Sequence, residues 1–282
     1  MFQNILFIIE ERELYERLAE VMTELAEGGR FVRAALGEEY PACMERWGIQ
    51  EADTVIVTDT ADLARQCAQK KTAVVAVLTE KNRDASMEGV PFALEGMENP
   101  GWDYFQKVYE RCHGLPWTIL ETERCLVREI CLGDLDRLYE IYAEPSVTRY
   151  MEGLFEDREK EAEYTRAYIR NMYGFYGYGM WIIEEKKKGR IIGRAGIENR
   201  EEEEEPEIGY LIAREEQGKG YALEVCLAIL DYAKEQLGFS KMACYVHPEN
   251  EASKGLCRKL GFEYRGQKES GGKVFSFYEK SL

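Results

Sequence analysis

Residues 215–224, EEQGKGYALE, combine two glycines, a lysine and the start of an expected helix near Tyr221. This arrangement suits phosphate binding, because glycines leave backbone amides accessible and the first turn of a helix presents its positive end. The spacing does not fit the P-loop pattern GxxxxGK[ST], since Lys219 lies between the glycines. A dinucleotide fingerprint GxGxxG would need a third glycine where Leu223 stands. From the loop alone, a phosphate site and a plain glycine-rich turn both remain open.

The segments around this loop predict a mixed arrangement of strands and helices. The periodicity of apolar residues and the positions of Gly and Pro indicate where these elements begin and end. Strands are expected at 124–130, in two parts of 180–200, at 208–213 and 240–246, and in a final hairpin over 262–281. Helices are expected at 133–144, 156–177, 221–238 and 250–261. We place this second domain at residues 116–282, and residues 115–125 lead into it.

The first part of the chain alternates strand and helix. Val/Ile-rich runs at 4–10, 53–59 and 72–78 predict buried strands, and 89–96 adds a short one. Helices are expected at 12–29, 60–70 and 100–114. This alternation is typical of a parallel sheet covered by helices, so we place an α/β module at residues 1–115.

Three linked segments of the second domain resemble the GNAT superfamily of acyl-CoA-dependent N-acetyltransferases, over residues 122–282. The sequence EIGYLI (207–212) is similar to the family's fourth strand, and QGKGYA (217–222) to its acyl-CoA loop. VHPENEASKGLCRKLGF (246–262) is similar to its closing strand, loop and helix. The similarity is greatest to the branch of ribosomal-protein N-terminal acetyltransferases. The chain is thus expected to be Rossmann-like or haloacid-dehalogenase-like in its first module and a mixed-sheet GNAT domain in its second.

The resemblance implies an N-acetyltransferase that uses acetyl-CoA as cosubstrate and needs no metal. The pyrophosphate of coenzyme A would bind the loop amides, and the pantetheine arm would pair with backbone at the end of the fourth strand. The implied coenzyme A contacts are Leu211, Ile212, Ala213, Gln217, Gly218, Lys219, Gly220, Tyr221, Ala222, Asn250 and Ser253. Lys219 either adds a positive charge or is simply solvated.

Attack of an amine on a thioester requires a base for the amine and a proton source for the thiolate. Glu207 is the first candidate base, because some relatives carry a catalytic glutamate on the fourth strand, and Glu198 is the reserve. Many relatives use a tyrosine of the last helix as acid, but Leu256 and Cys257 stand there. Ser253 matches a serine proposed for this role in the N-terminal acetyltransferase branch.

An aromatic stretch, NMYGFYGYGMW, lies where the family builds its acceptor wall. Ring faces and a carboxylate could together bind a cationic amine. The candidate acceptor-binding residues are Tyr150, Glu152, Tyr173, Tyr176, Tyr178 and Trp181. Packing in the core is the alternative for the aromatic residues, and His247 is expected to be a plain loop residue.

Composition limits the possible partners. The 282 residues are 45% hydrophobic and 32% charged, with a formal net charge of −16. This charge argues against nucleic acid and favours a cationic partner. No apolar run reaches the roughly 18 residues of a membrane span, and the start does not resemble a signal peptide. Eight scattered cysteines without a CxxC pair and two histidines indicate reduced thiols rather than a metal centre. We expect a cytoplasmic protein that binds neither nucleic acid nor membrane.

The first module has no comparable motif. Asp59 follows a strand of the parallel sheet, where ligands often bind, but FIIEERE replaces the DxDx[TV] nucleophile loop. A non-catalytic docking, sensing or substrate-shaping role is expected for residues 1–115, including binding of a protein partner. For the whole chain, the alternative to an enzyme is an acyl-CoA-binding sensor that does not acetylate amines. The acceptor amine, whether on a small molecule or a protein N-terminus, is left open.

Overall fold

The computed structural model describes residues 2–97, 100–200 and 203–282. The chain divides into two compact units, Met1–Trp117 and Thr118–Leu282. Both units combine helices with a sheet, parallel in the first and mixed in the second, so the predicted fold class is confirmed. In the described ranges, no helix has the length and apolar character needed to cross a bilayer.

The first unit is built on a parallel sheet with strand order β2-β1-β3-β4-β5, a doubly wound order. Its strands are β1 (Asn4–Ile9), β2 (Phe31–Leu36), β3 (Thr54–Thr58), β4 (Val74–Leu78) and β5 (Ala93–Glu95). Its helices are α1 (Arg12–Leu25), α2 (Tyr40–Trp47), α3 (Ala61–Gln69) and α4 (Trp102–Cys112), with a 3₁₀ turn at Glu51–Asp53. The expected parallel strands are present, and β2 and α2 are additions that the sequence patterns did not predict.

Both faces of this sheet are buried. Ile5 and Phe7 of β1 pack on one side with α1 and α4, whereas Leu6 and Ile8 pack on the other with α2 and α3. All six residues of β1 are buried, which explains its continuous apolar sequence. Complete burial of each such side chain stabilises the fold by about 1.5–3 kcal/mol.

The second unit contains an eight-stranded sheet among its described residues, in the order β12-β13-β11-β10-β9-β8-β7-β6. The strands are β6 (Thr118–Glu121), β7 (Cys125–Arg128), β8 (Met180–Glu185), β9 (Arg190–Glu198), β10 (Glu207–Ile212), β11 (Lys241–Val246), β12 (Glu263–Ser270) and β13 (Lys273–Ser281). Neighbouring strands are antiparallel, except that β10 and β11 are parallel. β6 lies in the segment that the sequence indicated as a linker.

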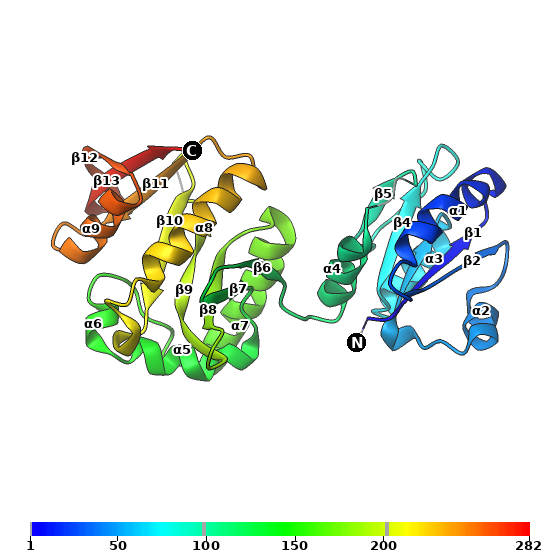
Figure 1. The fold of residues 1–282 in the computed structure, drawn as a ribbon, viewed down its shortest axis with the longest axis horizontal. Coiled ribbons are helices and arrows are strands. Elements are labelled where there is room, and N and C mark those ends of the chain that lie inside the picture. The colour runs from blue at the N-terminus through cyan, green and yellow to red at the C-terminus, as the bar shows by residue number, and fades with distance from the viewer. Residues whose placement is uncertain (1, 98–99, 201–202) are drawn as a thin grey trace. The chain divides into compact units, whose positions relative to one another are not determined.

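Helices cover this mixed sheet (Figure 1). They are α5 (Leu135–Tyr142), α6 (Pro145–Thr148), α7 (Arg158–Tyr168), α8 (Tyr221–Glu235) and α9 (Glu251–Lys259). A π-helix, Ile169–Tyr176, continues α7, and 3₁₀ turns occupy Leu132–Asp134 and Arg214–Glu216. Figure 1 shows α8 lying across β9 and β10. The inner face of α8 buries Val225, Ile229 and Ala233 completely, which fixes the end of the helix that begins at the glycine loop.

Candidate active site

The expected phosphate-binding loop connects β10 to α8. Gly218 and Gly220 have φ angles of 75° and 85°, a conformation that glycine adopts without steric cost. Helix α8 begins at Tyr221 without a side-chain cap. Within the described residues, no acceptor meets the backbone amides of residues 218–223. These consecutive amides are therefore available to an anion at the positive end of the helix.

Side chains of the loop itself hold it in place. The Nε2 atom of Gln217 donates a hydrogen bond of 2.9 Å to the carbonyl oxygen of Ile212, at the end of β10. The ammonium group of Lys219 lies 2.8 Å from Oε2 of Glu216, which also pairs with Arg190. The hydrogen bond from Lys219 lowers the pKa of Glu216. Lys219 thus forms an ion pair inside the loop, while its side chain stays half exposed. The sequence left open whether Lys219 adds a positive charge to the site or is solvated, and the ion pair is intermediate between these alternatives.

Arg124 is a loop residue that sequence reasoning missed. Its Nη1 atom donates to the carbonyl oxygen of Lys219 at 3.0 Å, and its Nε atom donates to Glu224 at 2.6 Å. Its guanidinium carbon lies 4.3 Å from the centre of the Tyr221 ring. Arg124 therefore brings a permanent positive charge to the start of α8. No local pattern announces this role, because Arg124 lies 95 residues before Lys219 in the chain.

The ladder between β10 and β11 ends almost as soon as it begins. Glu207 of β10 pairs with Ala243 of β11, and no further pair joins the two strands in the described chain. We call residues 208–212 and 244–246 the open strand pair. Of the expected contacts for an extended ligand, the amide of Ala213 donates to the carbonyl oxygen of Ile192 on β9 at 2.8 Å, and the carbonyl of Ile212 accepts from Gln217. The amide of Ile212 is left on the open side, because backbone groups alternate between the two edges of a strand. An extended ligand can therefore hydrogen-bond to this edge of β10 as an added strand does.

The two candidate bases face each other across strands β9 and β10. Glu207 and Glu198 are direct partners in the antiparallel ladder, so their side chains lie on the same face of the sheet. Arg200 donates to both carboxylate oxygens of Glu207, and the backbone amide of Tyr245 lies 3.3 Å from its Oε1 atom. The guanidinium of Arg200 is in turn stacked 4.3 Å from the Tyr245 ring.

The environment raises the pKa of both carboxyl groups. Burial raises the pKa of Glu207, and Arg200 partly opposes this effect. Burial also raises the pKa of Glu198, against the charges of Arg194 and Arg200 and a hydrogen bond from Tyr168. A carboxylate with a raised pKa accepts a proton more readily than one in water. The structure thus brings both predicted bases into one partly buried cluster.

The expected residues of the last helix lie at its start. Asn250 caps α9, because its Oδ1 atom accepts a hydrogen bond of 3.1 Å from the backbone amide of Ser253. The Ser253 hydroxyl is 2.9 Å from the hydroxyl of Tyr210 on β10. Asn250 therefore positions the backbone of Ser253, whose hydroxyl points toward β10.

The aromatic stretch does not form the acceptor wall that its sequence suggested. Trp181 is completely buried and meets the Tyr232 ring of α8 edge-on. Trp181 pairs with Ala195 of β9, which is three positions from Glu198. Because side chains alternate between the faces of a strand, Trp181 faces the side of the sheet opposite the two carboxylates. Tyr178 packs edge-on against Phe239 and bonds Asn199, while the buried Tyr173 donates to the carbonyl of Met180. Trp181, Tyr178 and Tyr173 are packing residues.

Two other acceptor candidates lie in the loop between α6 and α7. Tyr150 stacks on His247, with ring centres 4.8 Å apart, and Glu152 forms a 3.2 Å ion pair with Lys273. These contacts join the loop to the segment after β11 and to the β12–β13 turn. Tyr176, at the end of the π-helix, is 47% exposed. Tyr150 and Glu152 remain acceptor candidates, and His247 lies in the loop after β11, as expected.

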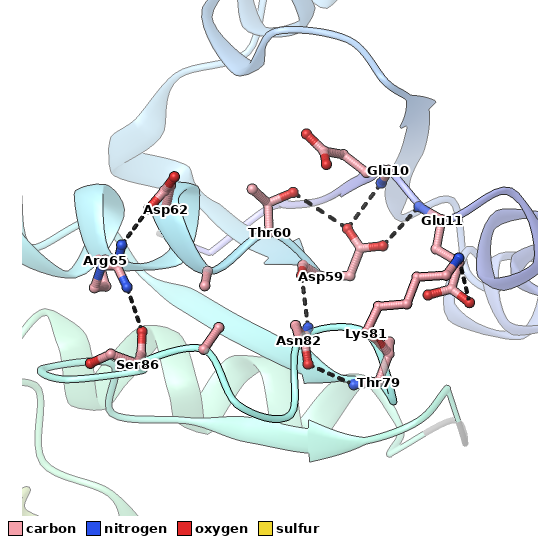
Figure 2. A pocket seen from close by; sticks show the side chains of 12 residues that line it. Glu10, Glu11, Asp59, Thr60, Asp62, Arg65, Thr79, Lys81, Asn82 and Ser86 are labelled. Atoms are coloured by element: carbon pink, nitrogen blue, oxygen red, sulfur yellow. Dashed lines mark hydrogen bonds and ion pairs between the residues drawn. The ribbon is translucent and has the colours of Figure 1, made fainter.

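The first unit has a cavity of about 520 Å³ at the carboxyl ends of β1, β3 and β4. Figure 2 shows Asp59 accepting hydrogen bonds of 2.9 Å from the backbone amides of Glu10 and Glu11. Asn82 donates to the carbonyl oxygens of Asp59 and Val77. Asp59, which the sequence placed at this edge, and Asn82, which it did not, thus connect neighbouring strand ends to one another.

Across the described ranges, no group of three His, Cys, Asp or Glu side chains has the arrangement of a metal site.

The similarity to known proteins lies in the second unit. The family model for the acetyltransferase (GNAT) domain matches residues 124–263. The chain is 35% identical over 168 residues to the uncharacterized protein YkkB of Bacillus subtilis (strain 168), covering 58% of this chain and 95% of that protein. It is 31% identical over 152 residues to the uncharacterized N-acetyltransferase YoaA of the same organism, covering 52% and 84%.

A solved structure has a similar fold. An acetyltransferase from Agrobacterium tumefaciens str. C58 aligns with a TM-score of 0.51 and 24% identity, covering 58% of this chain and 94% of that one.

Proposed function

The chain belongs to the GNAT family of acetyltransferases, and from this premise we propose that it transfers the acetyl group of acetyl-CoA to a primary amine. The family assignment and the enzyme class expected from the sequence are confirmed by the comparisons. The observation that carries the proposal is the conjunction of the open strand pair with the unpaired amides that begin α8. The first suits an extended thioester arm, and the second suits a pyrophosphate.

The residues of the loop fit coenzyme A chemically. The pyrophosphate would accept hydrogen bonds from the amides of residues 218–222, with the charge of Arg124 beside them. Gln217 and the Lys219–Glu216 ion pair would keep the loop in shape rather than bind the ligand. The pantetheine arm would lie beside Leu211, Ile212 and Ala213 and would bond to the backbone groups of β10 that face away from β9, such as the amide of Ile212. Asn250 and Ser253 would contact it from the start of α9.

Glu207 is proposed as the base, with Glu198 as its neighbour. An acceptor amine of high pKa arrives as an ammonium ion and must lose a proton before it can attack. The raised pKa of Glu207 favours transfer of that proton, directly or through a water molecule. Arg200 would help to return Glu207 to its ionised state after each turnover.

The acceptor is proposed to be cationic. A cationic acceptor would take the place of a cation that now pairs with a carboxylate, such as Lys273 at Glu152, and of the Arg149 guanidinium that lies over the Tyr150 ring. Glu198 and Glu207 would face its amine. A small-molecule amine and a protein N-terminus both fit this description. The exposed Tyr176 would contact the outer part of the acceptor.

The first unit is proposed to be a non-catalytic module that binds a protein partner or shapes the acceptor. The eight cysteines are free thiols, which supports a reducing compartment such as the cytoplasm.

The proposal is tested with a panel of amines, including polyamines, amino acid amides and short peptides, each incubated with the full chain and acetyl-CoA. Release of free coenzyme A thiol is measured with and without amine. An amine-dependent rate is expected with at least one cationic acceptor. Slow acetyl-CoA hydrolysis that no amine accelerates would instead favour the acyl-CoA sensor.

A further inference from the structure

A pair of hydroxyl groups connects the two sides of the open strand pair. Tyr210 lies on β10, three residues beyond the one that pairs with β11, and Ser253 lies in the first turn of α9, which follows β11. Their oxygen atoms are 2.9 Å apart. The contact joins positions 43 residues apart in sequence, at the point where the two strands no longer pair.

Both hydroxyls are held by their surroundings. The cap from Asn250 fixes the backbone of Ser253. Tyr210 lies in register with Ala195, which pairs with Trp181, so its ring points to the face covered by α8. Glu207 points to the opposite face, since it is an odd number of positions away along β10. The hydroxyl pair and the candidate base therefore lie on opposite sides of the sheet.

Either hydroxyl can donate in this hydrogen bond, and the two directions differ in whether a proton is left for a ligand. Burial raises the pKa of Tyr210, so its hydroxyl stays protonated over the physiological pH range and has one proton to donate. If Tyr210 donates to the Ser253 oxygen, the Ser253 proton is free to point elsewhere. The reverse direction would occupy the Ser253 proton and leave none for a ligand.

We propose that Tyr210 is a positioning residue for release of the thiol: it donates to the Ser253 oxygen and thereby directs the Ser253 proton at the sulfur of coenzyme A. This rests on the proposed function. In the reaction the amine nitrogen bonds to the acetyl carbon, the carbon–sulfur bond breaks, and sulfur keeps the electron pair. Glu207 receives one proton from the ammonium before attack, and the nitrogen releases a second proton to water as the amide forms. The Ser253 hydroxyl stabilises the thiolate by a hydrogen bond, and water protonates it as the product leaves.

The first test does not depend on the acceptor. Coenzyme A is bound to the full chain, and the ultraviolet absorbance of its thiolate is titrated against pH as a difference from unliganded protein. A hydrogen bond to the thiolate lowers the pKa of the bound thiol, and its loss in Tyr210→Phe should raise that pKa by about half to one pH unit. Ser253→Ala should produce a shift at least as large. Tyr278→Phe is the matched control, because Tyr278 is buried in the same core, and it should leave the titration unchanged.

A double-mutant cycle supplies the second readout, using turnover with whichever amine the panel identifies. Tyr210→Phe should lower kcat about threefold to tenfold and leave KM for acetyl-CoA unchanged. In the Ser253→Ala background it should have no further effect, because Tyr210 acts through Ser253.

The results separate the two proposals. An unchanged thiol titration in Tyr210→Phe, or additive losses in the cycle, would overturn the role of Tyr210 while leaving acetyl transfer intact. A wild-type chain that shifts the thiol titration but acetylates no amine would count against the proposed reaction and support the hydroxyl pair. If Tyr210→Phe does not fold, Ser253→Thr retains a hydroxyl at this position and should keep the titration close to wild type. If Ser253→Ala also gave a titration close to wild type, the proposed role of the Tyr210–Ser253 hydroxyl pair would be overturned.

Discussion

The two units satisfy the polar groups at their strand ends in opposite ways. In the first unit, the carboxylate of Asp59 accepts two backbone amides and the amide of Asn82 donates to two carbonyls. In the second, the amides that begin α8 have no acceptor within the described residues, and β10 leaves β11 after one pair. Unpaired backbone groups are costly unless water or a ligand satisfies them. The amides that begin α3 likewise have no acceptor in the described ranges, so it is the early end of the β10–β11 ladder that distinguishes the second unit as the one built around a ligand.

The largest expected effect concerns the base. Glu207→Gln keeps the shape of the side chain and removes its ability to take a proton, so turnover should fall about 10² to 10⁴-fold. The residual rate should rise with pH, since solution then supplies more neutral amine. Binding of acetyl-CoA should change little, because the loop is untouched. Turnover and KM are measured across the pH range with the best amine of the panel.

Glu198→Gln is the matched control for this test, since Glu198 lies in the same cluster and on the same face. It should lose less activity than Glu207→Gln. The opposite order would assign the base to β9 rather than β10.

The next effect concerns the unpaired amides. Gly220→Asp introduces a side chain and a negative charge where phosphate oxygens should approach, and coenzyme A binding should be lost. A hundredfold excess of coenzyme A over its Kd stabilises the wild-type chain by about 2.7 kcal/mol, and the variant should show no such thermal shift. Gly238→Asp is the control, because Gly238 also has a positive φ, of 70°, but follows the other end of α8. A full thermal shift in a folded Gly220→Asp chain would refute the loop assignment.

Much of the fold could be predicted from sequence, and the failures have physical causes. The buried strands β1, β3 and β4 and helix α8 carry strong apolar patterns. β2 and β6 do not, since both are edge strands whose residues are largely half-buried or exposed. Their apolar periodicity is weak, so they cannot be identified as strands from sequence without knowing the strand beside them.

The candidate site was predictable only where its residues are close in sequence. The glycine loop and the cap from Asn250 to Ser253 are local, and the patterns indicated both segments. The contacts of Arg124 with the loop and of Tyr210 with Ser253 join distant segments, so no local pattern reveals them. Trp181 was misplaced for a related reason: its face of the sheet depends on the register of β8 with β9, which the sequence does not state.

A smaller effect is expected at the strand ends of the first unit, where side chains satisfy the backbone groups. Asp59→Ala removes the acceptor of two amides and should destabilise β1 and β3 by about 1–3 kcal/mol. Hydrogen exchange of peptides from these strands measures the change locally. Asp62→Ala is the control, because its carboxylate is exposed and pairs only with Arg65 among the described residues; its effect should stay within about 0.5 kcal/mol. Equal protection in Asp59→Ala and wild type would show that these hydrogen bonds do not stabilise the strand ends.

The smallest effect is expected from separating the units. The described core residues of the second unit lie within Thr118–Leu282, and so does every proposed contact with coenzyme A. Residues 118–282 should therefore fold alone, show the wild-type thermal shift with coenzyme A, and acetylate a small amine within about twofold of the full chain. A protein acceptor that docks on the first unit should instead be acetylated more slowly by the fragment. An insoluble fragment, or one that does not bind coenzyme A, would contradict the contrast between the units. The first unit would then be needed for the fold or the coenzyme A site of the second.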